Sequence, residues 1–187
     1  MKLPLLITCL LFTTSAFATE PKPVEAPLTL QNGTVEFFAL GKPSMLKIHG
    51  VNSKLEGTLT PGKDRWDGFF KLKPVDFETG MKIRDEHLRE KVFEVNKFET
   101  SEFKFDQLKV PFNKTGSVKD LDFKGTLTLH GVKKEITGKL ELDRSADKTQ
   151  FGAKFEINLT DFAITPPEFM GMTIQNTVKV SVKGEAK

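Results

Sequence analysis

The segment from Val75 to Phe98, VDFETGMKIRDEHLREKVFEVNKF, departs from the strand pattern of the rest of the chain. Its residues Leu88, Val92 and Val95 recur at i, i+4 and i+7, which is the spacing of one helical face. Nearly everything before and after it alternates apolar and polar residues with a period of two, as strands do. The sequence therefore predicts an all-β chain with one short helical crossing around residues 83–93, of the kind that closes one end of a barrel or sandwich.

The charges of this crossing leave two roles open for it. Acidic residues fall early in the expected helix and basic residues fall late, which suits the helix dipole. Asp85 and Arg89 are four residues apart and are expected to form a weak ion pair. The crossing is then either a structural lid or a segment whose basic residues contact the head group of a ligand.

The first 18 residues have the pattern of a cleaved secretory signal. Lys2 is followed by the apolar run Leu3–Phe12 and by Ala16-Phe17-Ala18, a small-x-small cleavage pattern. The apolar run is too short for a membrane span, which needs about 20 residues. We therefore expect residues 1–18 to be removed on export and a mature chain with no transmembrane span.

Residues 19–31 contain three prolines and are expected to be a linker ahead of a single domain over residues 32–187. The one cysteine, Cys9, falls in the expected signal, so the exported domain must be held together by its core rather than by disulfides. Basic and acidic residues are interspersed, and the formal net charge is +3. This pattern lacks the basic stripe of a nucleic-acid-binding protein.

About nine strands with apolar residues at alternate positions are expected. They are Thr34–Leu40, Met45–His49, Lys54–Thr60, Arg65–Lys73, Glu102–Lys109, Asp122–Leu129, Glu135–Asp143, Gln150–Leu159 and Thr173–Lys183. The strands Met45–His49 and Lys54–Thr60 are expected to pair as a hairpin, and Asn113–Lys119 to form a polar loop. His49-Gly50-Val51 and His130-Gly131-Val132 are each placed at a hairpin turn, where glycine supplies a positive φ. The short connections favour an antiparallel meander, and about eight strands closed into a barrel can hold one small ligand.

Phenylalanine dominates the aromatic residues, because the chain has 17 of them, no tyrosine and one tryptophan. Phenylalanine buries a large apolar area and has no polar group, whereas tyrosine and tryptophan also offer a hydrogen-bonding group. Two explanations stay open at this point. The phenylalanines either fill the core or line an apolar cavity within it.

The sequence offers little support for catalysis. The three histidines are His49, His87 and His130, and a metal site needs two or three converging ligands. His87 and Glu90 lie one helical turn apart, but a solvated helix face produces the same spacing. No serine has a recognisable nucleophile context, and there is no glycine-rich phosphate loop. We therefore expect a protein that is not an enzyme and has no metal.

Two runs of residues carry a resemblance to a known family. The first consists of Thr79-Gly80, Arg84-Asp85-Glu86-His87-Leu88-Arg89, Phe93-Glu94-Val95, Phe98 and Phe103-Lys104-Phe105, and the second is GTLTLHGVKKEI from Gly125 to Ile136. Together they resemble the signatures of the YceI-like family of bacterial periplasmic proteins, over roughly residues 33–184. The resemblance implies an extended antiparallel lipocalin-like β-barrel. It also implies that the tubular apolar interior holds a long polyisoprenoid chain, such as a quinone tail.

Two positions depart from the family pattern, which has an Arg and then Asp-Phe-Gly-Ile near the end of a late strand. The aligned run here is INLTDFAI from Ile157 to Ile164. Leu159 therefore stands for the Arg, and Ala163 stands for the Gly. The fold is expected to tolerate both changes, whereas the head-group contacts of the family do not carry over.

The resemblance implies a periplasmic binding or carrier protein for a long-chain isoprenoid-type lipid, such as a polyprenyl lipid or a quinone, and a homodimer is also considered. The residues expected to line the interior are Phe37, Trp66, Phe70, Phe103, Phe105, Phe123, Leu127, Leu140 and Phe155. Arg84 and Arg89, near the barrel mouth, are expected to meet a phosphate or carbonyl head group. The alternative is a ligand-free barrel acting as a structural or stress-related interaction protein. A cavity count discriminates between the two, and inward side chains that meet across the barrel would contradict the carrier function.

Overall fold

The computed structural model describes residues 25–187 except 44–45, 113 and 170. The expected signal, residues 1–18, and residues 19–24 of the expected linker lie outside the described residues. No helix in the described part of the chain is both long and apolar enough to cross a membrane.

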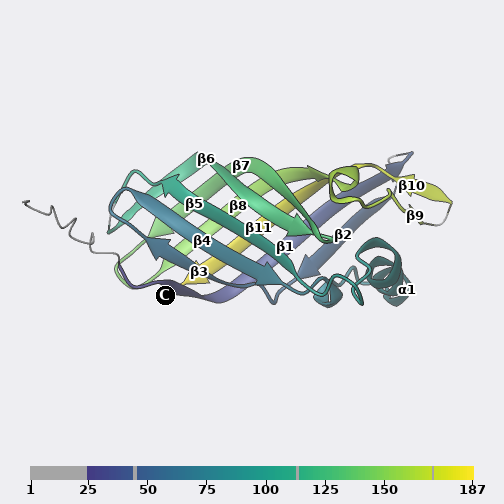
Figure 1. Ribbon diagram of the computed structural model, residues 1–187, viewed down its shortest axis with the longest axis horizontal. Coiled ribbons are helices and arrows are strands. Elements are labelled where there is room, and N and C mark those ends of the chain that lie inside the picture. Colours follow the sequence, from purple (N-terminus) through teal and green to yellow (C-terminus); the bar gives the residue numbers. More distant parts are fainter. Residues whose placement is uncertain (1–24, 44–45, 113, 170) are drawn as a thin grey trace, which may run out of the picture.

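Eight antiparallel strands close into an extended barrel (Figure 1). They are β1 (Leu28–Lys42), β3 (Glu56–Pro61), β4 (Arg65–Leu72), β5 (Ser101–Lys109), β6 (Gly116–Leu129), β7 (Val132–Arg144), β8 (Thr149–Asn158) and β11 (Thr177–Ala186). Each strand pairs with its neighbours in chain order, and β1 pairs with β11 to close the ring, with Phe37 opposite Val180. The predicted all-β antiparallel barrel is confirmed.

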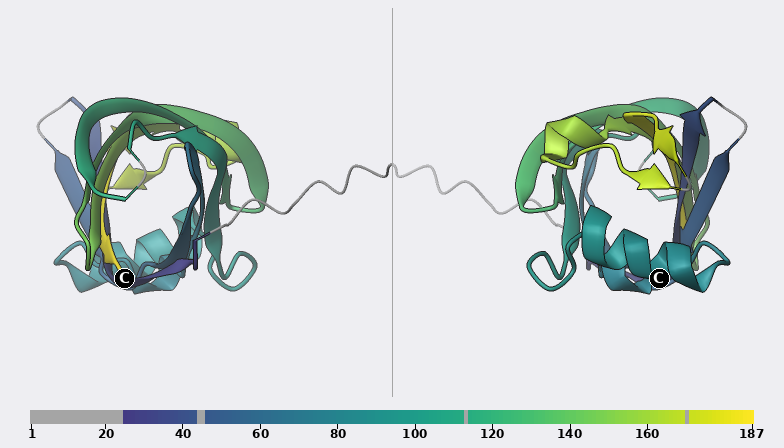
Figure 2. Two further views of the ribbon diagram at one scale, coloured as in Figure 1. Left: turned by 90° about the vertical axis from the view of Figure 1, so that its left-hand side faces the viewer. Right: turned by 90° about the vertical axis from the view of Figure 1, so that its right-hand side faces the viewer.

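The shorter elements gather at one end of the barrel, and the C-terminus lies at the other end (Figures 1 and 2). They are β2 (Lys47–Asn52), the 3₁₀ turn η1 (Pro74–Asp76), α1 (Lys82–His87), the π-helical turn η2 (Leu88–Val92), the 3₁₀ turn η3 (Leu159–Phe162), β9 (Glu168–Phe169) and β10 (Met172–Ile174). Together, α1 and η2 form the predicted helical crossing, which spans residues 82–92 rather than 83–93. Val92 is the buried member of its predicted apolar face.

The first strand begins earlier than predicted. β1 starts at Leu28 rather than Thr34, so the assignment of residues 28–31 to a linker is wrong. Leu28 pairs with Leu59 of β3, and Thr29 exchanges backbone hydrogen bonds of 2.7 and 3.0 Å with Lys187. The sequence did not predict this start for two reasons. The prolines just upstream favour a linker, and pairing with a distant strand leaves no local sequence pattern.

The predicted hairpin between Met45–His49 and Lys54–Thr60 is also wrong. β2 pairs with the second part of β1, and β3 pairs with the first part, on either side of a register shift near Leu30. Gly50 therefore lies within β2 and not at a turn, whereas Gly131 does lie at the predicted β6–β7 turn, with a φ of 74°. β6 begins at Gly116, so the predicted polar loop ends four residues earlier than expected.

The inward-facing phenylalanine rings lie against glycines of the neighbouring strands. The directly opposed pairs are Phe37 with Gly50, Phe70 with Gly57, Phe105 with Gly68, Phe123 with Gly138 and Phe151 with Gly184. A Cβ atom added at any of these glycines would lie between 2.2 and 2.8 Å from its partner ring. The glycines therefore leave room for the rings at the barrel wall, because the opposed residue has no side chain.

Gly68→Ala is expected to destabilise the protein by about 1–3 kcal/mol, the usual cost of overpacking. The added methyl group would lie 2.3 Å from Phe105 Cε1 and would force the ring to move. Urea unfolding measures the difference in free energy. Gly152→Ala on β8 is the matched control, because its nearest neighbour would be Val182 O at 3.9 Å. Equal losses in both variants would contradict this packing account.

Candidate functional site

Two apolar cavities lie inside the barrel. The first, of about 150 Å³, lies under the helical crossing and is lined by Phe77, Leu88, Val92 and Phe93 of the crossing and its flanks, together with side chains of the barrel wall. The second, of about 100 Å³, extends toward the other end, where Trp66 lines it and is only 1% exposed. The lining of both cavities is almost entirely apolar, so the barrel has an inner surface suited to hydrocarbon.

The two cavities meet at one level of the barrel. Five residues line both of them, and these are Val35, Leu72, Ser101, Leu127 and Phe155. Because these residues come from β1, β4, β5, β6 and β8, they form most of a ring around the lumen. The two cavities therefore adjoin at this level, one on the side of the helical crossing and one toward Trp66, along the length of the barrel.

Two buried polar atoms of this interior have no hydrogen-bond partner in the described part of the chain. They are Ser101 Oγ, at the level where the cavities meet, and Trp66 Nε1, at the far end. Buried polar groups in folded proteins are nearly always paired. Ser101 thus places a hydroxyl beside the lumen that is free to hydrogen-bond an oxygen atom of a molecule in the tube.

The other polar side chains facing the first cavity come from the crossing. Thr79, Arg84 and His87 line this cavity and are each partly exposed, so they connect the lumen with solvent. Arg84 Nε donates to Thr79 Oγ1 at 2.8 Å, and the Arg84 guanidinium carbon lies 6.0 Å from the centre of the Phe169 ring. This end therefore presents a cation and hydrogen-bonding groups beside an aromatic ring, which is the arrangement needed to contact a polar head group.

A hydrogen-bonded connection holds Thr79 and Arg84 in place. The buried Asp85 carboxylate accepts hydrogen bonds from the Thr79 backbone N–H at 2.8 Å and from Thr79 Oγ1 at 2.5 Å. Asp85 is thus paired with Thr79, and the weak ion pair predicted with Arg89 does not form. Arg89 Nε instead donates to Val75 O at 2.9 Å.

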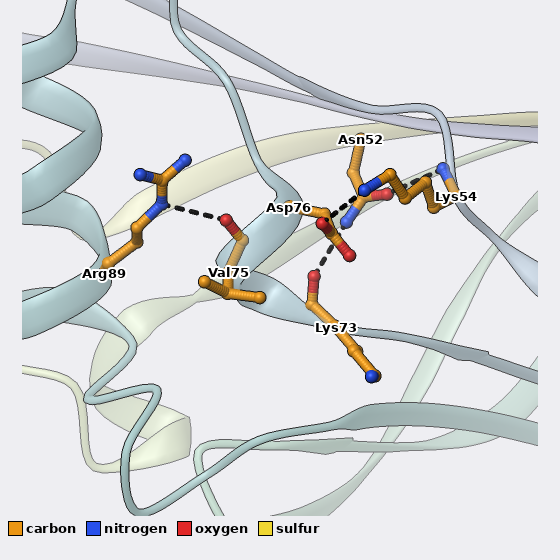
Figure 3. A network of polar contacts seen from close by, with 6 residues as sticks. All are labelled: Asn52, Lys54, Lys73, Val75, Asp76 and Arg89. Carbon is orange, nitrogen blue, oxygen red and sulfur yellow. Dashed lines mark hydrogen bonds and ion pairs between the residues drawn. The ribbon is translucent and has the colours of Figure 1, made fainter.

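A second network ties the crossing to the barrel wall (Figure 3). Asn52 is completely buried at the end of β2, where its side chain donates to Lys73 O and accepts from Lys54 N, both at 2.9 Å. Lys54 Nζ pairs with Asp76 Oδ1 at 2.8 Å. Nearby, Val51 and Glu78 exchange two backbone hydrogen bonds of 2.9 Å. The segment that leads into the crossing is therefore fixed to β2.

The end of the crossing is held by His130. Its Nδ1 lies 3.2 Å from Phe162 O, and its Nε2 lies 3.0 Å from Glu94 Oε2. Both neighbours are acceptors, so only the doubly protonated imidazolium donates to both at once. The pKa of Glu94 is lowered from its ordinary value, first by the hydrogen bond from Lys97 and then by the one from His130. These contacts join the crossing, the β6–β7 turn and η3.

Asn52→Ala is expected to lower the free energy of unfolding by about 2 kcal/mol, because it leaves Lys73 O and Lys54 N without their side-chain partner. Urea denaturation monitored by circular dichroism measures this change. Asn96→Ala is the control, since Asn96 is exposed and makes no side-chain hydrogen bond among the described residues. A loss in Asn52→Ala no larger than in the control would contradict the anchoring role.

Ten of the eleven predicted site residues line a cavity. Phe37 and Arg84 line the first, Leu127 and Phe155 line both, and the second is lined by Trp66, Phe70, Phe103, Phe105, Phe123 and Leu140. Arg89 lines neither cavity. Contact of these residues with a ligand stays a prediction.

Sequence reasoning missed several residues of the first cavity. Phe77 and Phe93 cover the crossing side, with ring centres 5.6 Å apart, and Phe77 lies 5.3 Å from Phe37. Both lie in or next to the crossing but outside the helical spacing on which the prediction relied. Leu159, which stands where the family has an Arg, also lines this cavity. Ala163 has a φ of 56°, a conformation that glycine adopts without strain.

Within the described residues, no group of three or more His, Cys, Asp or Glu side chains is arranged to hold a metal ion. His87 instead packs against Phe169, with ring centres 6.3 Å apart.

Several solved structures share this fold. A polyisoprenoid binding domain from Saccharophagus degradans, implicated in plant cell wall breakdown, is similar with a TM-score of 0.70 and 16% identity, over 86% of this chain and 97% of that one. Burkholderia cenocepacia BcnA gives 0.67 and 13% identity, over 83% and 96% of the two chains. The Campylobacter jejuni YCEI protein gives 0.61 and 19% identity, over 76% and 86%.

Sequence comparison shows the family of the chain. A UPF0312 protein of Pseudomonas fluorescens (strain SBW25) is 30% identical over 155 residues, which is 73% of each chain. Residues 21–186 match the family model of the YceI-like domain. The chain belongs to the YceI-like family, as its two signature runs predicted.

Proposed function

We propose that this protein is a periplasmic binding or carrier protein for a long-chain isoprenoid-type lipid. One observation carries the proposal, namely that two apolar cavities join at a shared ring of residues inside a closed barrel. A chain of carbon atoms is the ligand that such a lumen suits. The helical crossing supplies Thr79, Arg84 and His87 for the polar end of the lipid.

Burial supplies most of the binding free energy in this proposal. Each CH₂ group removed from water contributes about 0.8 kcal/mol, so affinity grows with chain length without polar specificity. The nearly uniform apolar lining of both cavities supports this mechanism. Arg84, already held by Thr79, adds a charge-assisted hydrogen bond to a phosphate or carbonyl oxygen at the entrance.

The relatives support the ligand class, and the N-terminal sequence supports the location. The Saccharophagus degradans neighbour is a polyisoprenoid binding domain, and we propose the same class of ligand for this chain. The signal pattern in residues 1–18 favours export to the periplasm. We propose binding rather than catalysis because polar groups are few in the lumen and are concentrated at one end.

The alternative is a barrel without a ligand that acts in structural or stress-related interactions. One aromatic pair, Phe70 and Phe151, does meet across the lumen, with ring centres 5.4 Å apart. Cavities nevertheless persist on the crossing side of this contact and around it, since both rings line the second cavity. This persistence favours the binding proposal.

Native mass spectrometry of the protein purified from its own periplasm tests the proposal. We expect a bound species of several hundred daltons, which organic extraction identifies as a prenyl lipid. The same spectrum reports whether a homodimer forms. An unliganded mass, together with no uptake of isoprenoids offered in detergent, would contradict the proposed function.

A pair of variants tests whether the bound species lies in the lumen. Leu127→Trp fills the level where the cavities meet and is expected to abolish retention of the lipid. Thr126→Trp places the same side chain one residue earlier on β6, at an exposed position, and is expected to leave retention unchanged. Thermal unfolding of both variants checks that the barrel is intact.

A further inference from the structure

The contact between Phe70 and Phe151 differs from every other ring contact of the barrel wall. Phe70 lies on β4 and Phe151 on β8, and their ring centres are 5.4 Å apart with an interplanar angle of 50°. Around the barrel, β5, β6 and β7 separate these strands on one side, and β3, β1 and β11 separate them on the other. The two rings are therefore diametrically opposed, and their contact crosses the lumen.

The remaining ring pairs of the barrel strands stay on the wall. Phe70 and Phe105 come from adjacent strands, as do Phe103 and Phe123. Phe123 and Phe155 are separated only by β7, where Gly138 lies between them in register. Among the described residues, Phe70 and Phe151 thus form the single aromatic pair that spans the barrel.

Both rings are supported from behind by glycine. A Cβ atom at Gly57 would lie 2.5 Å from Phe70 Cδ1, and one at Gly184 would lie 2.6 Å from Phe151 Cζ. The wall beneath each ring is therefore bare backbone. Neither ring has a polar group to hold it, so rotation about the side-chain bonds is opposed only by packing.

The position of the pair divides the tube into two unequal parts. Phe70 is two residues from Leu72, at the level where the cavities meet, which is about 7 Å along β4. Trp66, at the far end, is four residues away in the other direction, or about 13 Å. The crossing-side part includes the whole first cavity, whereas the part beyond the rings ends at Trp66.

We propose that Phe70 and Phe151 form a length-selecting floor in the lipid-binding tube. A chain that enters at the crossing extends until it reaches these rings, and a longer chain must displace them or fold back. The protein is therefore selective for apolar chains that end at the level of the rings. This inference rests on the proposed lipid-binding function and adds a limit on chain length to it.

A mixed series of all-trans prenols of increasing length, offered in detergent and read by native mass spectrometry, tests the floor. For the unaltered protein, retention is expected to rise with each added isoprene unit and then to stop rising at a limiting length. Phe70→Ala and Phe151→Ala are each expected to move this limit to longer chains. A prenol one unit beyond the original limit should bind either variant about tenfold more tightly, because more of its CH₂ groups leave water.

Controls separate this effect from a general loss of packing. Phe69→Ala removes the exposed ring next to Phe70 on β4, which lines neither cavity, and it should leave the limiting length unchanged. Phe70→Leu and Phe151→Leu replace the alanine variants if those do not fold, and they are expected to move the limit in the same direction. The double variant should have the same limiting length as either single variant, because each single substitution already removes the contact between the two rings.

Two further results would overturn the inference, and they can be told apart. Uptake of prenols with the same limiting length in the Phe70 and Phe151 variants as in the unaltered protein would overturn the floor and leave the lipid-binding function standing. Failure of the unaltered protein to retain a prenol of any length would overturn both.

Discussion

The fit of phenylalanine rings against glycines on neighbouring strands is the constraint on which the barrel interior depends. Large side chains on the inner face of an eight-stranded barrel would ordinarily fill it. Here the residue opposite a ring repeatedly has no Cβ, as at Phe105 and Gly68, so the ring lies along the wall. A lumen rich in phenylalanine can therefore stay apolar and partly open. Phe70 and Phe151 also face glycines, but their two rings meet each other across the tube.

The helical crossing makes the two ends of the tube chemically different. Asn52 fixes its start to the barrel wall, and His130 fixes its end to the β6–β7 turn. Between these anchors, Thr79, Arg84 and His87 face the first cavity, whereas Trp66 and apolar side chains occupy the opposite end. Under the proposed function, an amphipathic lipid lies with its polar end at the crossing. The two roles that the sequence left open are compatible, because the structural lid also carries the polar groups.

The local sequence pattern predicted much of the fold, and long-range pairing accounts for most of the errors. Period-two alternation identified the strands, and the spacing of Leu88 and Val92 identified the crossing, because both patterns depend on neighbouring residues. The early start of β1 and the pairing of β2 depend on distant partners. For the site, inward-facing phenylalanines could be chosen from strand alternation. The roles of Thr79, Asp85 and Arg89 could not be predicted, because the hydrogen-bond partners of side chains in an irregular segment depend on its three-dimensional geometry.

The most direct test of this account is a crystal structure of the protein loaded with a prenol that carries bromine at the end of its chain. Anomalous scattering locates the bromine independently of the rest of the lipid. The account predicts one bromine peak inside the barrel, on the crossing side of Phe70 and Phe151, with the hydroxyl end of the prenol near Arg84. A bromine peak on the outer surface, or at the crossing with the hydroxyl buried near Trp66, would contradict it.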